Sequence, residues 1–239
     1  MNTHRTLISL DDVGVDYKPS RAIFRRGTAY TALKSVSFDV LAGDSIGIIG
    51  RNGAGKSTLL KVISGIITPD RGKLTNNNAS TSLLSLQTGF DPALPGRKNI
   101  YLSGLLLGFS KNHIDQQLEN IIDFSELGNF IDRPVQTYSS GMRARLGFSI
   151  ASQLKPDILL VDEVLAVGDH EFRQKSSQAM KEKIRSDQTV ILVSHNAALV
   201  KALCNKIVWI ENGTVKAKGT PEQVLENYEQ YITQNPPKM

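Results

Sequence analysis

The stretch Gly50-Arg51-Asn52-Gly53-Ala54-Gly55-Lys56-Ser57 decides the fold, because it fits the pattern G-x-x-x-x-G-K-[ST] of a phosphate-binding loop. The apolar run at residues 46–49 predicts a buried strand before the loop, and residues 57–63 predict a helix after it. The loop therefore opens onto a helix N-terminus, where backbone N–H groups and the helix dipole favour an anion. An ordinary glycine-rich turn is the alternative, and the flanking strand and helix disfavour it. The pattern predicts that the chain binds a nucleoside triphosphate.

Each residue type in this loop is expected to make a different contact with a triphosphate. The glycines let successive N–H groups turn towards phosphate oxygens. Lys56 is expected to reach the β- and γ-phosphates, and Ser57 to place its hydroxyl on a Mg²⁺ ion that bridges them. The predicted nucleotide contacts in and after the loop are Gly50, Asn52, Gly53, Ala54, Gly55, Lys56, Ser57 and Thr58.

Length and composition describe an ordinary globular protein of 239 residues, 40% hydrophobic and 21% charged. No apolar run approaches the ~18 residues of a membrane span, and the N-terminus lacks a secretory apolar stretch, so we expect a cytoplasmic location. Cys204 is the single cysteine, which excludes an internal disulfide. The net charge of +5 suits a nucleic-acid or anionic-membrane partner, or simply a mildly basic surface. We favour the last and expect no nucleic-acid partner, because the basic residues are spread along the chain.

Hydrophobic periodicity predicts an α/β fold of the P-loop NTPase type with a parallel sheet core. Residues 7–10 and 36–40 alternate as strands do and predict an N-terminal antiparallel β region. Apolar strands return at residues 158–161 and 190–193, separated by a helix at about 171–184. Such alternation of strand and helix is typical of a parallel sheet.

Between these parts the pattern turns helical and predicts an inserted α-helical subdomain at about residues 85–154, with its clearest helices at 99–107 and 114–122. We therefore expect one nucleotide-binding domain whose core spans about residues 1–84 and 155–239.

The last third of the core carries two strong local signals. Asn212-Gly213 between two short apolar runs predicts a β-hairpin with a type I′ turn. A final helix is predicted from Thr220 as N-cap, Pro221 in the first helical position and Gln223 completing a capping box.

Polar residues follow the two core strands of the second half. Asp162 and Glu163 come directly after residues 158–161, where Asp162 suits a carboxylate on Mg²⁺ and Glu163 a general base for an attacking water. His195 follows the next strand and is placed to hydrogen-bond the γ-phosphate or that water. Alone, an acidic pair is usually a solvated turn and a lone histidine incidental, but the phosphate loop upstream favours the catalytic interpretation.

The stretch Tyr138-Ser139-Ser140-Gly141-Met142 completes a diagnostic order of motifs. By itself it predicts a helix N-cap, at which Ser139 and Gly141 offer a hydroxyl and an N–H group to a second phosphate group. With the phosphate loop before it and the Asp-Glu and Ser-His pairs after it, the chain resembles the ATP-binding-cassette family over almost its whole length. The resemblance implies that Ser139, Ser140 and Gly141 of one subunit close over ATP held by another, so that a homodimer with ATP and Mg²⁺ is the working form.

The resemblance also assigns roles outside these motifs. Tyr17 is similar to the aromatic residue that stacks on adenine, with Phe24 and Tyr30 as alternatives in the same region. Gln87 is similar to the glutamine that contacts Mg²⁺ and the attacking water. Residues 167–169 fall where the family has a loop that crosses to the partner subunit.

The signature departs from the usual Leu-Ser-Gly-Gly-Gln family pattern, because Ser140 and Met142 replace the first Gly and the Gln. The signature at residues 138–142, residues 164–169, and Gly89-Phe90-Asp91-Pro92 leading to residues 96–101 together resemble the branch that exports cell-surface polysaccharides and teichoic acids. This implies an ATPase, peripheral on the cytoplasmic face of the inner membrane, that drives a separate integral-membrane permease exporting a lipid-linked glycan. Because the chain ends at Met239, we expect no C-terminal carbohydrate-binding domain.

Two questions stay open at this point. The apolar stretch 100–109 either receives a helix of the permease or packs the helical subdomain. The alternatives to glycan export are transport of another substrate, a soluble regulatory or assembly ATPase, and a binding-only switch. Glu163 and His195 disfavour the switch.

Overall fold

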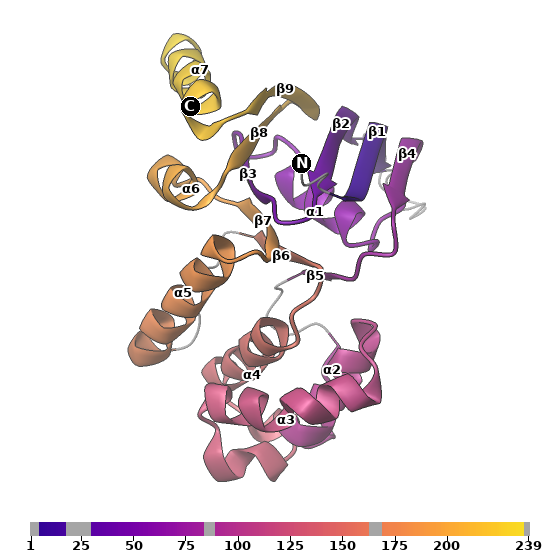
Figure 1. Ribbon diagram of the computed structural model, residues 1–239, viewed down its shortest axis with the longest axis vertical. Coiled ribbons are helices and arrows are strands. Elements are labelled where there is room, and N and C mark those ends of the chain that lie inside the picture. Colours follow the sequence, from indigo (N-terminus) through magenta and orange to yellow (C-terminus); the bar gives the residue numbers. More distant parts are fainter. Residues whose placement is uncertain (1–4, 18–29, 84–88, 163–168, 237–239) are drawn as a thin grey trace, which may run out of the picture. The chain divides into compact units, whose positions relative to one another are not determined.

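A computed structural model describes residues 5–17, 30–83, 89–162 and 169–236, and Figure 1 labels its elements along the chain. The chain divides into two compact units. The first consists of residues 1–79 and 189–239, and the second of residues 80–188. None of the helices in the described ranges is both long enough and apolar enough to cross a membrane.

The first unit contains a mixed sheet in the order β4-β1-β2-β9-β8-β3-β7. Its strands are β1 (Thr6–Tyr17), β2 (Tyr30–Leu41), β3 (Ser45–Ile49), β4 (Arg71–Asn76), β7 (Thr189–Val193), β8 (Lys206–Glu211) and β9 (Thr214–Gly219). Strand β1 pairs antiparallel with β2 and β4, whereas β3 pairs parallel with β7 and β8. The predicted α/β fold with an antiparallel N-terminal region is confirmed.

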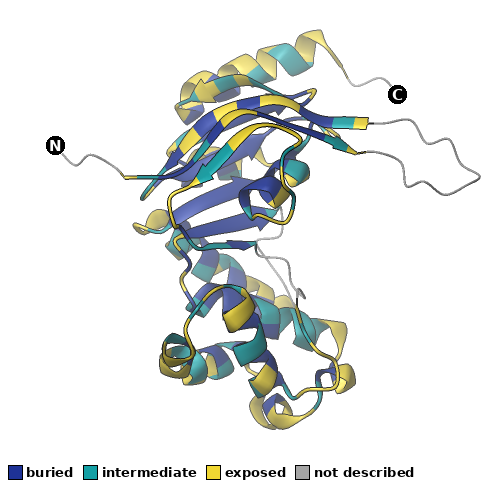
Figure 2. Ribbon diagram, turned by 90° about the vertical axis from the view of Figure 1, so that its right-hand side faces the viewer, coloured by how far each residue is buried: buried dark blue, intermediate teal, exposed yellow. Residues whose placement is uncertain are grey.

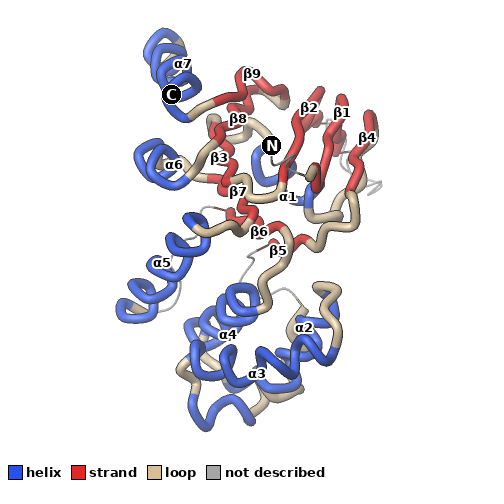
Figure 3. The backbone as a smooth tube through the Cα atoms, viewed as in Figure 1, coloured by secondary structure: helices blue, strands red, loops and turns tan. Residues whose placement is uncertain are grey.

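The core of this unit lies around its parallel strands. Every residue of β3 and β7 is buried, as Figure 2 shows by the dark blue central strands. The helices of this unit are α1 (Lys56–Ile63), α6 (Ala197–Leu203) and α7 (Pro221–Gln234). Helix α6 contacts β3, and α7 contacts β8 and β9 (Figure 3). This packing fixes the strand from which the phosphate loop leaves.

The C-terminal signals are confirmed except for one hydrogen bond. Asn212 and Gly213 have φ values of 51° and 77° between β8 and β9, as a type I′ turn requires. Helix α7 begins at Pro221 after Thr220, as predicted, but the Thr220 side chain makes no capping hydrogen bond. The capping-box prediction is wrong in this respect, because Pro221 already fixes the φ of the first turn and lets the helix begin without that bond.

The second unit combines two parallel strands with a group of helices. Strands β5 (Thr81–Leu83) and β6 (Ile158–Asp162) are parallel. The helices are α2 (Gly96–Leu106), α3 (Lys111–Ser125), η1 (Gly128–Asp132), η2 (Val135–Thr137), α4 (Ser140–Gln153) and α5 (His170–Arg185). Ten buried side chains from α2 to the end of α4 form one core, with Ile100, Ile114 and Leu146 fully enclosed. The helices predicted at 99–107 and 114–122 are therefore present, while the proposed division at 85 and 154 stays a prediction.

Candidate functional site

The phosphate loop runs between the buried end of β3 and the start of α1. Gly50 has a φ of 149° and Gly55 a φ of 107°, a region that other residues rarely adopt. A Cβ atom at Gly50 would lie 2.0 Å from the carbonyl oxygen of Ile210, and one at Gly55 would lie 2.6 Å from that of Ala32. The loop is thus packed so tightly against β8 and β2 that both positions accept only glycine.

Lys56 lies at the first position of α1 with a relative exposure of 6%. Its Nζ atom donates to the carbonyl oxygens of Gly50 at 2.8 Å and Arg51 at 2.9 Å. Helix α1, which is wholly described, has no acidic residue in its first turn and no side chain capping it at Gly55. The N–H groups of that turn and the ammonium group therefore form a positive, anion-accepting end.

A pocket of about 240 Å³ opens at this helix end. Its lining residues come from β2, the loop and the first turn of α1. They are Tyr30, Ala32, Asn52, Gly53, Gly55, Lys56, Ser57 and Thr58. The pocket gathers most of the predicted nucleotide contacts, with the hydroxyl groups of Ser57 and Thr58 available as oxygen ligands of the kind Mg²⁺ accepts.

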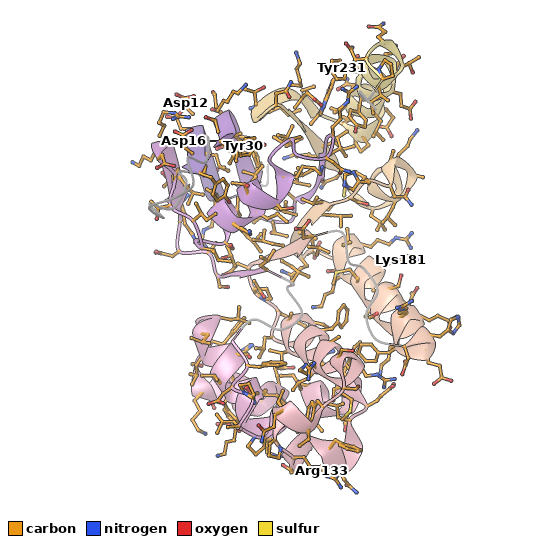
Figure 4. The ribbon with its side chains drawn as sticks, turned by 180° about the vertical axis from the view of Figure 1, so that it is seen from behind. Asp12, Asp16, Tyr30, Arg133, Lys181 and Tyr231 are labelled. Carbon is orange, nitrogen blue, oxygen red and sulfur yellow. The ribbon has the colours of Figure 1, made fainter. Side chains whose placement is uncertain are left out.

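Two tyrosines reach the loop from the strands beside it. Tyr17 and Tyr30 are cross-strand partners at the end of the β1–β2 ladder, where Asp16 also lies (Figure 4). The Tyr17 hydroxyl is 3.4 Å from Thr58 Oγ1, and the Tyr30 hydroxyl donates to the carbonyl oxygen of Gly53 at 2.9 Å. Tyr30, given above only as an alternative, is the tyrosine that lines the pocket. Phe24 lies outside the described residues.

The Ser194-His195 pair leaves the sheet at the same edge as the phosphate loop. Ile48 of β3 pairs with Val193 of β7 in parallel register, and Ser194 N donates to the carbonyl oxygen of Ile48 at 3.4 Å. Ser194 is buried, and His195 is exposed. The strand pairing thus brings His195 to the edge at which it was expected.

The predicted site residues Gln87, Asp162 and Glu163 lie at or after the ends of the two strands of the second unit. Strand β6 is fully buried up to Val161 and ends at the half-buried Asp162. Leu83 of β5 pairs with Leu160 of β6, so these parallel strands end at one edge. Gln87 and Glu163, which follow them in the sequence, lie outside the described residues, as do residues 167 and 168.

The signature segment forms the start of α4 as predicted. Ser139 is the N-cap, and its Oγ atom accepts a hydrogen bond from Met142 N at 3.1 Å. Ser139 and Ser140 are exposed, and Gly141 is half-buried. The helix end is therefore open to a ligand from outside this unit.

A second pocket, of about 370 Å³, lies beside the signature segment. Its lining residues come from the end of α3, η1, α4 and the residue before α5. They are Glu126, Leu127, Phe130, Ser139, Gly141, Met142, Arg145 and Asp169. The polar side of this pocket carries charges of both signs.

Arg145 forms ion pairs with both acidic residues of this pocket. The sequence analysis did not name it. Its guanidinium group bonds Glu126 at 3.1 Å and Asp169, and lies 5.0 Å from the ring centre of Phe172. Lys175 adds a second cation on Glu126 at 2.6 Å. Arg145 thus connects the signature helix to the N-cap of α5. The available sequence signal was its position one helical turn after Gly141.

Asp169→Asn is expected to lower the melting temperature more at pH 7 than at about pH 3. The hydrogen bond from Arg145 lowers the pKa of Asp169 below its ordinary value of 3.8. A carboxyl group with a lowered folded-state pKa contributes stability above its unfolded-state pKa and loses it as the pH falls through the folded-state value. Asparagine keeps an oxygen to cap Phe172 N but has an NH₂ group in place of the oxygen that accepts from Arg145, so the change removes the ion pair and leaves the cap. Equal losses at both pH values would contradict this prediction.

Comparison with known proteins agrees with this geometry. The family described as "ABC transporter" matches residues 33–166. The O-antigen export system ATP-binding protein RfbB of Klebsiella pneumoniae is 46% identical over 90% of this chain and 87% of its own length. The teichoic acids export ATP-binding protein TagH of Lactococcus lactis subsp. lactis (strain IL1403) is 44% identical over 85% of this chain, which spans 43% of that longer protein.

Solved structures share the fold at lower identity. An ATP-binding subunit of an ABC transporter superposes with a TM-score of 0.74 at 23% identity, over 94% of each chain. A dimeric post-hydrolysis state of the ATP-binding cassette MJ0796 with ADP and Pi has a TM-score of 0.70 at 21% identity, over 90% of this chain and 98% of that one. The family prediction made from the order of the motifs is confirmed, and the chain belongs to the ABC transporter family.

Proposed function

We propose that this chain is the ATP-hydrolysing subunit of an exporter that moves a lipid-linked cell-surface polysaccharide across the cytoplasmic membrane through a separate permease. The observation that carries the nucleotide part is the tightly packed phosphate loop with Lys56 at the open end of α1. The cargo is supported by the likeness to RfbB, a protein named for O-antigen export, over 87% of that protein's length. Relatives named for teichoic acid export support the same class of cargo.

In this proposal the first unit binds the phosphates and the adenine ring of ATP. The N–H groups at the start of α1 accept the phosphates, and Lys56 turns from the loop carbonyls to the β- and γ-phosphate oxygens. Tyr17 or Tyr30 stacks on the adenine ring. Ser57, Asp162 and Gln87 are the residues that would hold Mg²⁺, and their oxygen donors fit that ion. When bound, Mg²⁺ would neutralise the negative charge of the phosphates.

Hydrolysis needs one proton transfer and one bond exchange. Glu163 takes a proton from the attacking water, whose oxygen bonds to the γ-phosphorus while the bond to the β–γ bridging oxygen breaks. His195, at the phosphate-loop edge of the sheet, hydrogen-bonds the transferred phosphoryl group. The products are ADP and inorganic phosphate.

The exposed signature segment completes the site of a second copy. Ser139, Ser140 and Gly141 offer a hydroxyl and the N–H groups at the start of α4 to the ATP held by the partner's phosphate loop. The fold shared with a cassette solved as a dimer supports a head-to-tail homodimer. Each copy then contributes one phosphate loop and one signature segment to the pair of sites.

Helix α2 offers a surface for the permease. Leu105 and Leu106 are 54% and 68% exposed, whereas Ile100 on the same helix is buried in the core. In the apolar stretch 100–109, Ile100 packs the helical core, whereas Leu105 and Leu106 are proposed to receive a helix of the permease. Two large exposed apolar side chains beside each other favour a partner helix at the membrane surface.

Deleting the chain from its host tests the export step. Surface glycan is expected to fall while lipid-linked glycan accumulates inside the cell. A copy carrying Lys56→Ala should fail to restore export, and a copy carrying Lys61→Ala, a change of an exposed lysine on the same helix, should restore it. Unchanged surface glycan in the deletion strain, with ATP hydrolysis intact in the purified protein, would assign the ATPase to another exported substrate or to a regulatory role.

A further inference from the structure

Two segments that distinguish this chain from the common family pattern meet inside the second unit. One is residues 89–101, which end in α2, and the other is the signature at residues 138–142. A Cβ atom at Gly96 would lie only 2.3 Å from the Tyr138 hydroxyl oxygen and 3.0 Å from the carbonyl oxygen of Ile131. The space beside Gly96 is therefore filled by the end of the Tyr138 side chain.

Tyr138 is fixed in this place by its hydroxyl and its backbone. The hydroxyl donates to the carbonyl oxygen of Phe130 at 2.6 Å, and the ring belongs to the buried core around Ile100. Burial raises the pKa of Tyr138, so the group stays a proton donor. Tyr138 N donates to the carbonyl oxygen of Val135 at 3.0 Å, and the Tyr138 carbonyl accepts from Arg143 Nη1 at 2.7 Å. The next residue is the cap of α4.

The segment on the other side of the contact is equally well bonded. The buried amide nitrogen of Asn99 donates to the carbonyl oxygens of Asp91 at 3.0 Å, Leu94 at 3.0 Å and Pro95 at 3.2 Å. Its Oδ1 atom accepts from Asp91 N at 2.8 Å. The Asn99 side chain thus bonds four backbone groups of the turn at residues 91–95.

Backbone hydrogen bonds join this turn to the chain that leads into the signature. Val135 N donates to the carbonyl oxygen of Leu94 at 3.0 Å, and Gln136 N donates to that of Pro92 at 2.8 Å. The turn and residues 135–136 are therefore bonded to each other, and Tyr138, which contacts Gly96, directly precedes Ser139 in the chain.

We propose that Tyr138 is a positioning residue whose hydroxyl, seated against Gly96, sets the placement of Ser139 from the segment 91–96. The inference rests on the proposed function, in which Ser139 contacts the ATP of a partner copy. A shift of residues 91–96 would reach the signature segment through this contact. The contact between residue 96 and Tyr138 requires glycine at position 96, because any Cβ atom there would displace the tyrosine.

Gly96→Ala is the direct test. The added methyl group overlaps the Tyr138 hydroxyl and should displace Ser139, lowering kcat by about 10- to 100-fold, the effect expected of a misplacement near 1 Å. The Kd for MgATP should stay within about twofold of the wild-type value, because the phosphate loop belongs to the first unit. A loss of kcat without a loss of affinity separates positioning from general destabilisation.

A second substitution should reverse the first. Tyr138→Phe removes the atom nearest to the new methyl group, so the double variant Gly96→Ala/Tyr138→Phe should turn over faster than Gly96→Ala and approach Tyr138→Phe alone. The contacts at 3.0 Å to Ile131 leave the recovery incomplete. Ile114→Val is the matched control, because it removes a methyl group from the same core and changes neither Gly96 nor Tyr138, so it should leave kcat unchanged.

The hydrogen-exchange rate of the Met142 backbone amide, which donates to Ser139 Oγ, tests the Gly96–Tyr138 contact without a measurement of ATP turnover. Exchange should quicken in Gly96→Ala and slow again in the double variant. The proposal would be overturned if Gly96→Ala kept the wild-type kcat and exchange rate, or if the double variant had the same kcat and exchange rate as Gly96→Ala.

If the wild-type protein hydrolyses no ATP, the proposed function fails, and the exchange data alone decide whether the Gly96–Tyr138 contact positions Ser139. If Gly96→Ala does not fold, Tyr138→Phe takes its place, with faster exchange and lower kcat expected at an unchanged Kd.

Discussion

Lys56→Ala is expected to weaken MgATP binding by about 10- to 100-fold while the chain stays folded. Among the described residues, Lys56 provides the one charged side chain that lines the pocket over the phosphate loop. A hydrogen bond to a charged group contributes about 1.5–3 kcal/mol, and about 1.4 kcal/mol corresponds to tenfold in affinity. ATP turnover should fall with the binding, because the same ammonium group is proposed to contact the γ-phosphate.

Calorimetric titration of MgATP into the purified variant measures this loss. Lys61→Ala is the matched control, because Lys61 is an exposed lysine in the last turn of the same helix α1. Circular dichroism of both variants shows whether the fold is kept. Unchanged affinity in Lys56→Ala would refute the assignment of the loop, and an equal loss in Lys61→Ala would show that the effect comes from the overall charge.

The sequence predicted the parts of this fold that rest on local signals. The apolar strand before residue 50, the helix after it and the N-cap at Ser139 each follow from a few neighbouring residues. The Asn212-Gly213 turn is a signal of the same kind, since its positive φ values belong to the residue types themselves. The phosphate loop and the signature segment could therefore be placed before any tertiary contact was known.

The elements that escaped prediction depend on distant partners. Strand β4 at Arg71–Asn76 is polar and mostly exposed, so it lacks the apolar alternation of a half-buried strand and forms by pairing with β1. Strand β5 has only three residues and is set by its pairing with β6. Neither strand carries a period that a sequence window can detect.

The same limit applies within the site. Tyr30 reaches Gly53 only because β1 and β2 pair at their ends, and Arg145 meets Asp169 across 24 residues of chain. The Gly96–Tyr138 contact joins residues 42 positions apart. These contacts leave no local signal in the sequence, so the sequence analysis placed Tyr17 first with Tyr30 as an alternative and did not name Arg145.

Glu163→Gln is expected to lower ATP turnover by about 10²- to 10⁴-fold, the usual contribution of a general base. Glutamine keeps the size of glutamate and its hydrogen-bonding oxygen but does not accept a proton from water at neutral pH. MgATP affinity should stay near the wild-type value, because Lys56 and the start of α1, and not Glu163, are proposed to hold the phosphates. Steady-state phosphate release, measured beside MgATP titration, separates the two effects.

The oligomeric state of this variant distinguishes chemistry from binding. If ATP closes two copies on each other and hydrolysis reopens them, Glu163→Gln should accumulate as a dimer in MgATP, measurable by light scattering, while the wild-type protein returns to monomer as ATP is consumed. Asp162→Asn is the contrasting variant. Because Asp162 is proposed to hold Mg²⁺, loss of its carboxylate should weaken MgATP binding as well as turnover.

Undiminished hydrolysis in Glu163→Gln would show that Glu163 is not the general base. A loss of affinity equal to that of Lys56→Ala would instead place Glu163 among the groups that bind the nucleotide, and the proton acceptor would then have to be sought elsewhere, with His195 first because it leaves the sheet at the phosphate-loop edge.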